Sequence, residues 1–457
     1  MSNTTLRRLF RSASGSCALA LCVLALQSIA PASAAVRTVA NCNDSGAGSL
    51  RDAVAIAAGG DTIDLAGLAC NRIALTSGQI EVPQDGLTLV GPGAAALVID
   101  GNRLGRVFAH TGAGTLRLQR LSVAKGRIIS PEARGGCIYS AGDVELTRVR
   151  LHRCVADATS PLPGEQALGG GVFAYGTVTL SHSSAFYNNA DHIGGAIMAD
   201  DVVLDHSTLY ENRAWLGGGF WAYYNATIDY SVVRDNRAGG TGGGFLMNCN
   251  SGPGSRCRLI IRRSTLSANR AHREAAFSAQ STHRIVIRNS TITGNVANQT
   301  SVARLPTSSS RYWGWVRIYN STIASNHEQP QDSETCAGAI GMFGGLELLL
   351  ESTIVSGNTC SLGDDKDIYG GGGALLIGGN NIIGRSDIPV PDDTILATDP
   401  RLEPLANNGG STPTRRPLAD SPALDRGSNV LDLLYDQRGP GFPRVQGAFP
   451  EIGAIEH

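Results

Sequence analysis

A repeated motif between Gly194 and Asn295 constrains the fold more than any other feature of the sequence. Four copies begin at Gly194, Gly217, Gly242 and Glu274. In each copy a short apolar run, a Ser or Thr, a second apolar pair and an Asn follow in fixed order, and most copies open on a glycine cluster. Self-similarity of this kind is typical of proteins built from stacked structural repeats.

The spacing of the repeat predicts the fold class. The closing asparagines Asn188, Asn212 and Asn236 lie about 24 residues apart, close to one turn of a right-handed parallel β-helix with three strands and three bends. Later spacings lengthen to roughly 26 to 33 residues, which we interpret as insertions at the bends. A chain of 457 residues with 57 Gly suits many tight turns between short strands. We therefore expect an all-β, right-handed parallel β-helix solenoid.

One short helix is expected near the start of the solenoid. Ser49 is a suitable N-cap, Asp52 places a carboxylate in the first turn, and Gly59 and Gly60 end the apolar pattern. Such a helix can plug the open end of the first coil, where strand edges and apolar core would otherwise be exposed.

The first residues have the pattern of a signal peptide, which we place at 1–34. Arg7, Arg8 and Arg11 precede the apolar run from Ala18 to Leu26, and Ala32-Ser33-Ala34 is a small-residue cleavage site. The alternative, a membrane anchor, needs a longer apolar run. We expect export to the periplasm, the extracellular space or the cell surface.

The net charge narrows the class of partner. Removing the leader takes away three arginines and no acid, so the formal charge falls from −1 to −4. A mildly acidic chain argues against nucleic acid and anionic lipid as partners. No other stretch is long and apolar enough to span a membrane. We expect a monomer.

Eight cysteines remain in the mature chain and fall into sequence neighbours. Residues of a solenoid contact only their own or the adjacent coil, which favours nearest-neighbour disulfides. The alternative, a metal site, lacks any Cys/His cluster with ligand spacing. The predicted pairs are Cys42 with Cys70, Cys137 with Cys154, Cys249 with Cys257, and Cys336 with Cys360.

Successive residues of a strand face opposite sides of the sheet, so the repeat predicts which of them point into the core and which point outward. Three and five positions before the repeat serine the residues are aliphatic, for example Leu204 and Val202, and they are expected to face inward. The recurring asparagines are expected to be structural, because identical amides at strand spacing can hydrogen-bond along the axis. In the coil before that of Asn188, Cys154 occupies the position that the recurring asparagine takes in the later coils. The asparagines are Asn188, Asn212, Asn236, Asn269, Asn295, Asn326 and Asn358.

Two outward columns change from acidic to basic along the axis. Two positions before the repeat serine the column reads Ser181, Asp205, Asp229, Arg262, Arg288, Tyr319, and six positions before it reads Thr177, Asp201, Asn225, Arg258, Arg284, Trp315. Asp205 and Asp229 are candidates to hold Ca²⁺ against a uronate. Arg262 or Arg288 would then neutralise the uronate or take the proton next to its carboxylate. The alternative is a solvated face on which neighbouring coils alternate charge.

Aromatic residues cluster on the same coils although only 5% of the chain is aromatic. Flat rings on the flank of a solenoid suit stacking on sugar rings, whereas rings inside it or under an insertion would be core. The candidate ligand-binding residues are Tyr210, Trp215, Trp221, Tyr223, Tyr224, Trp313 and Trp315.

The end of the chain carries short motifs that resemble a known family. Asp399-Pro400, Asn408-Gly409-Gly410, Ser421-Pro422-Ala423, Asp436-Gln437-Arg438-Gly439 and Glu451-Ile452-Gly453-Ala454 occur in that order. Together with the repeat, they resemble bacterial parallel β-helix proteins with a choice-of-anchor Q domain. The resemblance implies a secreted or surface-displayed β-helix of unassigned function. The Gly-, Pro- and Asn-rich end is expected to be a C-terminal cap, in which Asp436 and Arg438 pin the loop to the last coil rather than act on a substrate.

These patterns together favour a non-enzymatic protein that binds an extracellular or cell-surface glycan or a protein, without a cofactor. The alternative is a polysaccharide lyase or glycoside hydrolase acting on acidic polysaccharide, with Ca²⁺ in the case of the lyase. The expected regions are the signal peptide, an N-terminal cap with the first coils at 35–106, the β-helix at 107–393 and the C-terminal cap at 394–457.

Overall fold

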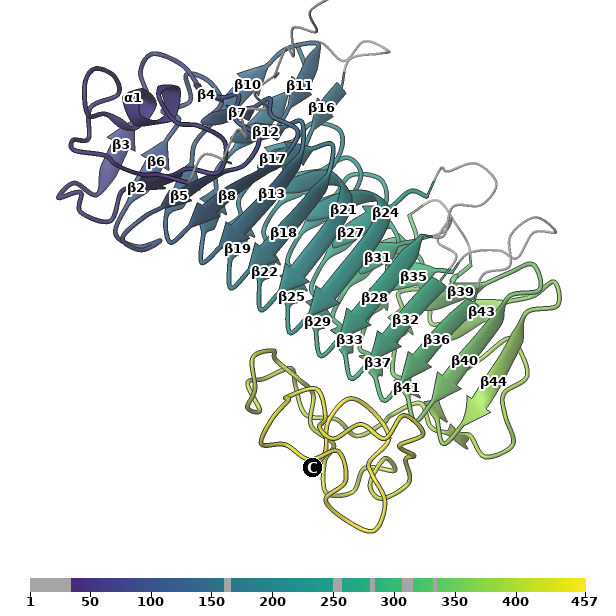
Figure 1. Ribbon diagram of the computed structural model, residues 1–457. Helices are drawn as coiled ribbons and strands as arrows, with labels where there is room; N and C mark the ends of the chain where they lie inside the picture. Colours follow the sequence, from purple (N-terminus) through teal and green to yellow (C-terminus); the bar gives the residue numbers. More distant parts are fainter. Residues whose placement is uncertain (1–33, 160–165, 250–256, 280–283, 306–314, 332–334) are drawn as a thin grey trace, which may run out of the picture. The chain divides into compact units, whose positions relative to one another are not determined.

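The computed structural model describes residues 34–159, 166–249, 257–279, 284–305, 315–331 and 335–457. Ala34–His457 forms one compact unit. It is an all-β right-handed parallel β-helix of about 11 turns, as the repeat predicted (Figure 1). The predicted signal peptide, apart from Ala34, lies outside the described residues. Within the described residues, no helix is long and apolar enough to cross a membrane.

Most strands of the described residues belong to three long parallel sheets, here called sheets A, B and C. Sheet A contains β1 (Val36–Thr38), β2 (Thr62–Asp64), β4 (Ile80–Val82), β5 (Leu87–Val90), β7 (Phe108–His110), β8 (Thr115–Gln119), β12 (Ile138–Ser140), β13 (Asp143–Thr147), β17 (Val172–Ala174), β18 (Thr177–Ser181), β21 (Ile197–Asp205), β24 (Phe220–Asp229), β27 (Phe245–Met247), β28 (Arg258–Arg262), β31 (Phe277–Ser278), β32 (Arg284–Arg288), β36 (Trp315–Tyr319), β40 (Glu347–Glu351) and β44 (Leu375–Gly379). Sheet B contains β3 (Arg72–Ala74), β6 (Val98–Asp100), β9 (Ser122–Ala124), β14 (Arg150–His152), β19 (Ser184–Phe186), β22 (Thr208–Tyr210), β25 (Val232–Arg234), β29 (Thr265–Ser267), β33 (Thr291–Thr293), β37 (Thr322–Ala324), β41 (Ile354–Val355), β45 (Ile382–Ile383) and β46 (Ile395–Leu396). Sheet C contains β10 (Arg127–Ile129), β15 (Val155–Asp157), β20 (Asn189–Ala190), β23 (Arg213–Ala214), β26 (Arg237–Ala238), β30 (Arg270–Arg273), β34 (Val296–Gln299), β38 (His327–Glu328) and β42 (Thr359–Cys360). Two small sheets hold β11 (Glu132–Arg134) with β16 (Gln166–Leu168), and β35 (Ala303–Arg304) with β39 (Ile340–Met342) and β43 (Ile368–Gly370).

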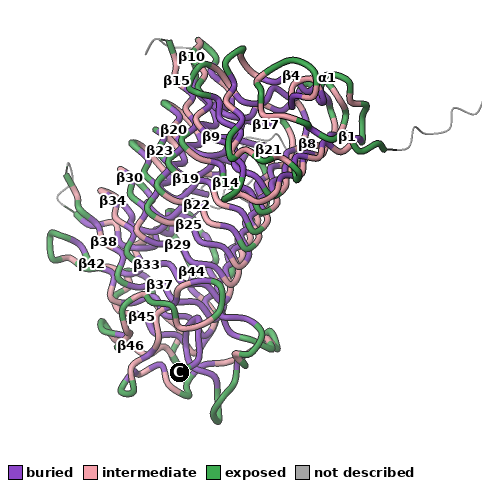
Figure 2. Tube along the Cα trace, turned by 90° about the vertical axis from the view of Figure 1, so that its left-hand side faces the viewer, coloured by how far each residue is buried: buried purple, intermediate pink, exposed green. Residues whose placement is uncertain are grey.

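Each regular coil visits the three sheets in turn, as β18, β19 and β20 do before the chain enters β21. Successive coils pair in register, so that Val202 lies between Val178 and Ala226, and Leu209 faces Val233. The inward columns are buried throughout, which confirms the predicted alternation. Stacking identical positions therefore produces one continuous apolar core along the solenoid (Figure 2).

The recurring asparagines form a buried hydrogen-bonded ladder. In each step, the Nδ2 and backbone N of one Asn donate to Oδ1 of the next, as between Asn236 and Asn269 at 3.1 Å for both bonds. The same Nδ2 also donates to a backbone carbonyl of the sheet B strand in the preceding coil, such as Leu209 of β22 for Asn236. Cys154 occupies the equivalent slot and donates its backbone N–H to Asn188. The structural interpretation of the asparagines is confirmed.

The N-terminal helix α1 (Leu50–Ala55) forms where the sequence predicted it. The hydroxyl of Ser49 accepts a hydrogen bond from the backbone N–H of Asp52, and the helix ends at Ala55, with Ile56 as its C-cap, before the predicted glycines. Leu50 and Val54 are buried in the main core, so α1 covers apolar side chains at the N-terminal end of the solenoid (Figure 1).

All four predicted disulfides are present: Cys42–Cys70, Cys137–Cys154, Cys249–Cys257 and Cys336–Cys360. Each one joins positions at most 28 residues apart, so the bridges staple single or adjacent coils. Four disulfides fit a protein that folds in an oxidising compartment.

The C-terminal segment from 397 to 457 runs back along the outer face of sheet B (Figure 1). The side chain of Gln437 donates to Thr265 in β29 and accepts from Thr291 in β33. Arg438 is buried and pairs with Asp436. The C-terminal segment does pack on the last coils, where Ala423 and Ile452 contact Ile354 of β41 and Ile382 of β45. Asp436 and Arg438, however, flank Gln437 against β29 and β33, several coils before the last coil to which they were expected to pin the loop. At the third position of each strand, β29, β33 and β37 carry the small outward residues Ser267, Thr293 and Ala324, whereas β19, β22 and β25 carry Phe186, Tyr210 and Arg234 there. The later strands therefore leave room for the segment.

The outer face of sheet B earlier in the solenoid carries a stack of rings, His152, Phe186 and Tyr210, with centroids 4.9 and 4.8 Å apart. Nδ1 of His152 is buried without a hydrogen-bond partner among the described residues. Burial, helped by the charge of Arg153, lowers the pKa of His152 to about 4. The folded protein therefore binds fewer protons than the unfolded chain between about pH 6.5 and pH 4. Stability is lost as the pH falls through this window.

We expect His152→Phe to remove this loss, because phenylalanine keeps the stack and cannot be protonated. Between pH 7 and pH 4 the wild type should lose about 1–2 kcal/mol more unfolding free energy than the variant, after allowance for solvent screening. Urea unfolding at both pH values measures the difference. The control is His206→Phe, which replaces an exposed histidine that also stacks on a neighbouring ring, at the bend that follows β21. Equal losses in wild type and His152→Phe would contradict the prediction.

Candidate functional site

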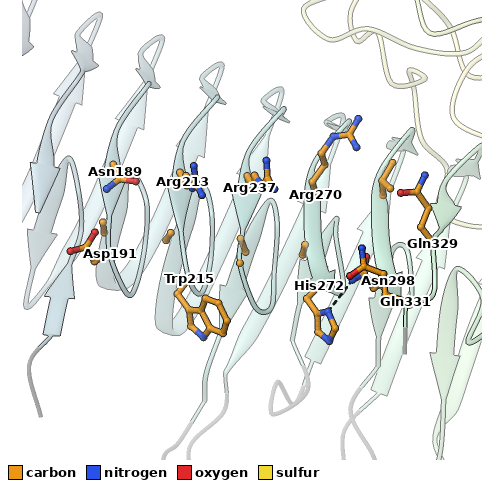
Figure 3. A pocket seen from close by; sticks show the side chains of 16 residues that line it. Asn189, Asp191, Arg213, Trp215, Arg237, Arg270, His272, Asn298, Gln329 and Gln331 are labelled. Carbon is orange, nitrogen blue, oxygen red and sulfur yellow. Dashed lines mark hydrogen bonds between the residues drawn. The ribbon is translucent and has the colours of Figure 1, made fainter. Parts of the chain in front are cut away.

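A groove of about 870 Å³ crosses the outer face of sheet C, over β20, β23, β26, β30 and β34 (Figure 3). Its floor is made of two outward columns, one from the first position of each strand and one from two positions later. Because the strands are in register, each coil adds one residue to each column at strand spacing, about 4.8 Å. The groove is thus a direct product of the repeat.

The first column contains three stacked arginines, Arg213, Arg237 and Arg270 (Figure 3). Each follows a ladder asparagine and precedes a buried alanine, so that the Asn and Ala point inward and fix the Arg outward. All three are exposed, and none forms an ion pair with another described residue. Asn189 and Val296 continue the column on either side.

The arginine column is electrostatically unfavourable in the free protein, because like charges directly opposite in a sheet repel. At strand spacing in water each neighbouring pair costs about 0.8 kcal/mol. Of the described residues that line the groove, Asp191 alone carries a carboxylate, and it lies near one end and accepts a hydrogen bond from the Ala158 N–H. The arrangement is therefore suited to a ligand that brings several negative charges at regular spacing.

The second column holds Trp215, which is 58% exposed. Its indole lies over Gly239 of the next coil, where a Cβ atom would approach the ring to within 2.5 Å. Glycine at this position therefore lets the indole lie along the groove floor. A large exposed ring beside a row of cations is a suitable platform for a sugar ring.

His272 and Asn298 continue the second column on the next two coils (Figure 3). Nδ2 of Asn298 lies 3.1 Å from Nδ1 of His272 and donates to it. In the neutral ring this arrangement places the imidazole proton on Nε2. His272 thus adds a hydrogen-bond donor two residues beyond Arg270.

The predicted catalytic residues lie on a different face, on the outside of sheet A. Asp205, Asp229, Arg262 and Arg288 are cross-strand neighbours, as the sequence implied. However, Asp229 is nearly buried and binds two arginines, Arg262 at 2.8 Å and Arg263 at 2.7 Å. Its carboxylate is fully engaged, so the predicted pair of aspartates is not free to share a Ca²⁺ ion.

Asp205 instead lies beside two histidines. Its Oδ1 is 2.9 Å from Nδ1 of His206, and the rings of His206 and His182 stack with centroids 4.8 Å apart. One possible ligand atom from each residue lies within 4.8 Å of the others. Two imidazoles and one carboxylate suit Zn²⁺ better than Ca²⁺, which prefers oxygen ligands. We assign no chemistry to this trio.

The predicted aromatic residues separate into several environments. Trp221 is buried in a satellite core, and Tyr210 lies between Phe186 and the guanidinium of Arg234. Tyr223 and Tyr224 are exposed on sheet A, and Trp315 lies there beside two arginines. Trp313 lies outside the described residues. Trp215 is the member of the predicted set that lines the groove.

Sequence reasoning missed the arginine column, although its signal is visible. The string Asn-Arg-Ala recurs at 212–214, 236–238 and 269–271, immediately after the repeat. Each arginine stands next to a structural asparagine, so in the sequence the whole string has the appearance of architecture.

No family model matches the chain, and no curated protein is similar to it in sequence. The choice-of-anchor Q resemblance therefore stays a prediction. Among solved structures, pectate lyase Pel9A is similar in fold, with 14% identity, a TM-score of 0.43 and coverage of 92% of this chain and 96% of the other. The PL6 family alginate lyase AlyGC has 15% identity and a TM-score of 0.44, with coverage of 89% of this chain and 60% of the other. Both neighbours act on polysaccharides according to their names.

Proposed function

We propose that the protein is exported and binds an acidic polysaccharide in the groove of sheet C. The observation that carries the proposal is the column Arg213, Arg237 and Arg270, three exposed cations without ion-pair partners among the described residues. A polymer with one carboxylate per sugar would offer one charge to each coil, because a pyranose ring and the strand spacing are comparable in length. Trp215 would stack on one ring of the same chain.

The groove favours an acidic polysaccharide over other ligands. A neutral glycan would leave the three guanidinium groups repelling one another without compensation. Nucleic acid is disfavoured because Trp215 is the one Trp, Tyr or Phe side chain among the described residues that line the groove, whereas single-stranded nucleic acid binds by stacking successive bases on several rings. A cell-surface or extracellular glycan rich in uronate is the ligand class that fits both the charge and the ring.

Titration of the purified protein with a polyuronate tests this proposal. We expect saturable binding that quenches or shifts the fluorescence of Trp215, weaker binding by at least tenfold for the neutral polymer of the same sugar backbone, and no binding of DNA at equal salt. The Trp215→Phe variant should lose the part of the fluorescence change that arises in the groove, and about 1–2 kcal/mol of binding free energy there. Equal affinity for neutral and acidic polymer, or for DNA, would contradict the proposal.

A polysaccharide lyase is the second candidate, because His272 places a titratable group two residues from Arg270 inside the groove. Elimination needs a cation on the uronate carboxylate and a base for the neighbouring proton. The hydrogen bond from Asn298 occupies Nδ1, and in the neutral ring the proton is then on Nε2, so neither nitrogen is free to accept the substrate's proton in this arrangement. Ultraviolet absorbance from unsaturated chain ends, with and without Ca²⁺, distinguishes turnover from binding. Activity that disappears in His272→Ala, or in a double Asp205→Ala, Asp229→Ala variant, would identify an enzyme and its site.

A further inference from the structure

A second basic surface lies on the outer face of sheet A, over β28, β32 and β36. Arg258 pairs in register with Arg284, Arg262 with Arg288, and Arg284 with Trp315. The exposed side chains of Arg258, Arg284 and Arg317, together with half-buried Arg288, form no ion pair with another described residue. This surface is named here the sheet A patch.

The sheet A patch differs from an ordinary mixed-charge face. Nearby Arg262 and Arg263 share the carboxylate of Asp229. Arg288 forms no ion pair with a carboxylate in the described part of the chain, and burial together with the charges of Arg262 and Arg263 lowers its pKa. Four guanidinium groups on three adjacent coils thus repeat the charge pattern of the groove on sheet C.

The arginines of the sheet A patch lie beside an aromatic ring, that of Trp315, and beside a surface cavity. The arginines of the groove likewise lie beside an aromatic ring within a cavity. The guanidinium carbons of Arg317 and Arg284 lie 4.5 and 5.9 Å from the centroid of Trp315. A hollow of about 410 Å³ extends from Arg258 and Arg284 toward Asp201. The Asp201 carboxylate accepts two hydrogen bonds from Asn225 at Oδ1, so it is tied to its own face.

The two basic surfaces lie on different sides of the solenoid. Each coil passes from sheet A through sheet B to sheet C and then into sheet A of the next coil, as β18, β19, β20 and β21 do, so the outer surfaces of sheets A and C are two different faces of the solenoid. Figure 2 shows β19, β22 and β25 of sheet B facing the viewer, with β20, β23 and β30 of sheet C along one edge of the solenoid. The C-terminal segment additionally covers part of sheet B. A single extended polymer segment lying along one face therefore cannot contact both surfaces.

We propose that the sheet A patch and the groove of sheet C bind two separate segments of acidic polysaccharide, so that one protein molecule cross-links two polymer chains. The nature of the ligand rests on the proposed function. The existence of two sites rests on the separate placement of the two arginine sets. The protein would then organise a polyanionic matrix rather than merely attach to it.

Calorimetric titration with a short oligouronate, too short to reach both faces, tests the number of sites. We expect two per monomer in the wild type. One should remain in a groove variant, Arg213→Gln, Arg237→Gln, Arg270→Gln, and one in a patch variant, Arg258→Gln, Arg284→Gln, Arg317→Gln. The variant Arg103→Gln, Arg148→Gln, Arg150→Gln, which removes the same charge from exposed positions elsewhere, should keep both.

Light scattering with long polyuronate tests cross-linking directly. Scattering by the wild type should pass through a maximum at an intermediate protein-to-polymer ratio and fall at excess protein, while either single-surface variant binds polymer without the maximum. Sedimentation must show that the protein alone is monomeric. A patch variant that keeps two sites and cross-links like the wild type would overturn the proposal and leave the groove intact. Absence of any uronate binding by the wild type would instead refute the proposed function.

Discussion

Replacing Asn269 with alanine is expected to lower the free energy of unfolding by about 3–6 kcal/mol, because it breaks the buried ladder in the middle of the solenoid. Oδ1 of Asn269 accepts from both the backbone N and Nδ2 of Asn236. Its Nδ2 donates to the carbonyl of Val233 and to Oδ1 of Asn295. Alanine would remove all four of these buried hydrogen bonds and would leave the backbone N–H of Asn236 without its acceptor, whereas Asn236 Nδ2 keeps its bond to Leu209 and Asn295 Oδ1 keeps its bond from the backbone N–H of residue 269. Each lost hydrogen bond costs about 0.5–1.5 kcal/mol, and the unsatisfied N–H costs more.

Chemical denaturation of Asn269→Ala measures this loss. Asn269→Asp is expected to be at least as damaging, because a carboxylate cannot donate to Val233 and would face Oδ1 of Asn295. Thr227→Ala, on the outer face of sheet A, is the surface control and should change stability by less than about 0.5 kcal/mol. A loss in Asn269→Ala no greater than in the control would show that the ladder is not a stabilising element.

Replacing Arg213, Arg237 and Arg270 together with glutamine is expected to weaken oligouronate binding in the groove by roughly two to three orders of magnitude. Each exposed guanidinium contact with a carboxylate is worth about 1–1.5 kcal/mol. Removing like charges also relieves repulsion, so the variant should be as stable as the wild type or slightly more stable. Loss of affinity would then be separable from loss of fold.

Fluorescence titration over a range of salt concentrations provides the measurement. The Trp215→Phe variant serves as the control for fluorescence changes of tryptophans outside the groove, which are subtracted. If the ligand contacts all three arginines, the slope of log K against log salt should weaken by roughly 0.7 for each arginine removed, as for single-stranded polyanions. The control variant at Arg103, Arg148 and Arg150 should keep the slope. A triple groove variant with unchanged affinity and slope would contradict the assignment of the groove.

The architecture could be predicted from the sequence because it depends on local periodicity. The period-two alternation fixed which side of each strand faces inward, and Leu204 and Val202 are buried as expected. The repeating slot of Asn212 and Asn236 determined the ladder. Pairing of Cys249 with Cys257 followed from the rule that a solenoid residue contacts only nearby coils.

The candidate site was less predictable because it depends on register across insertions. Arg213 and Arg237 are 24 residues apart, whereas Arg237 and Arg270 are 33 apart, yet both pairs are directly opposite in the sheet. The extra residues between β27 and β28 hide this equivalence in the sequence. Asp229 was misjudged for a related reason: Arg263, at the bend of the next coil, turns toward it with a positive φ of 48°.

The course of the C-terminal segment has a consequence for how the solenoid comes apart. In a stack of coils each coil is stabilised by its neighbours, so the ends fray first. Here Gln437 binds β29 and β33, Ala454 binds Thr322 of β37, and Ser428 binds the bends of later coils. Several coils, from that of β29 to that of β41, are thereby bound by the same C-terminal segment. None of them can unfold fully without breaking its contacts with that segment. Unfolding should therefore begin at the N-terminal coils. The coils bound by the C-terminal segment should resist local unfolding more than the N-terminal coils do.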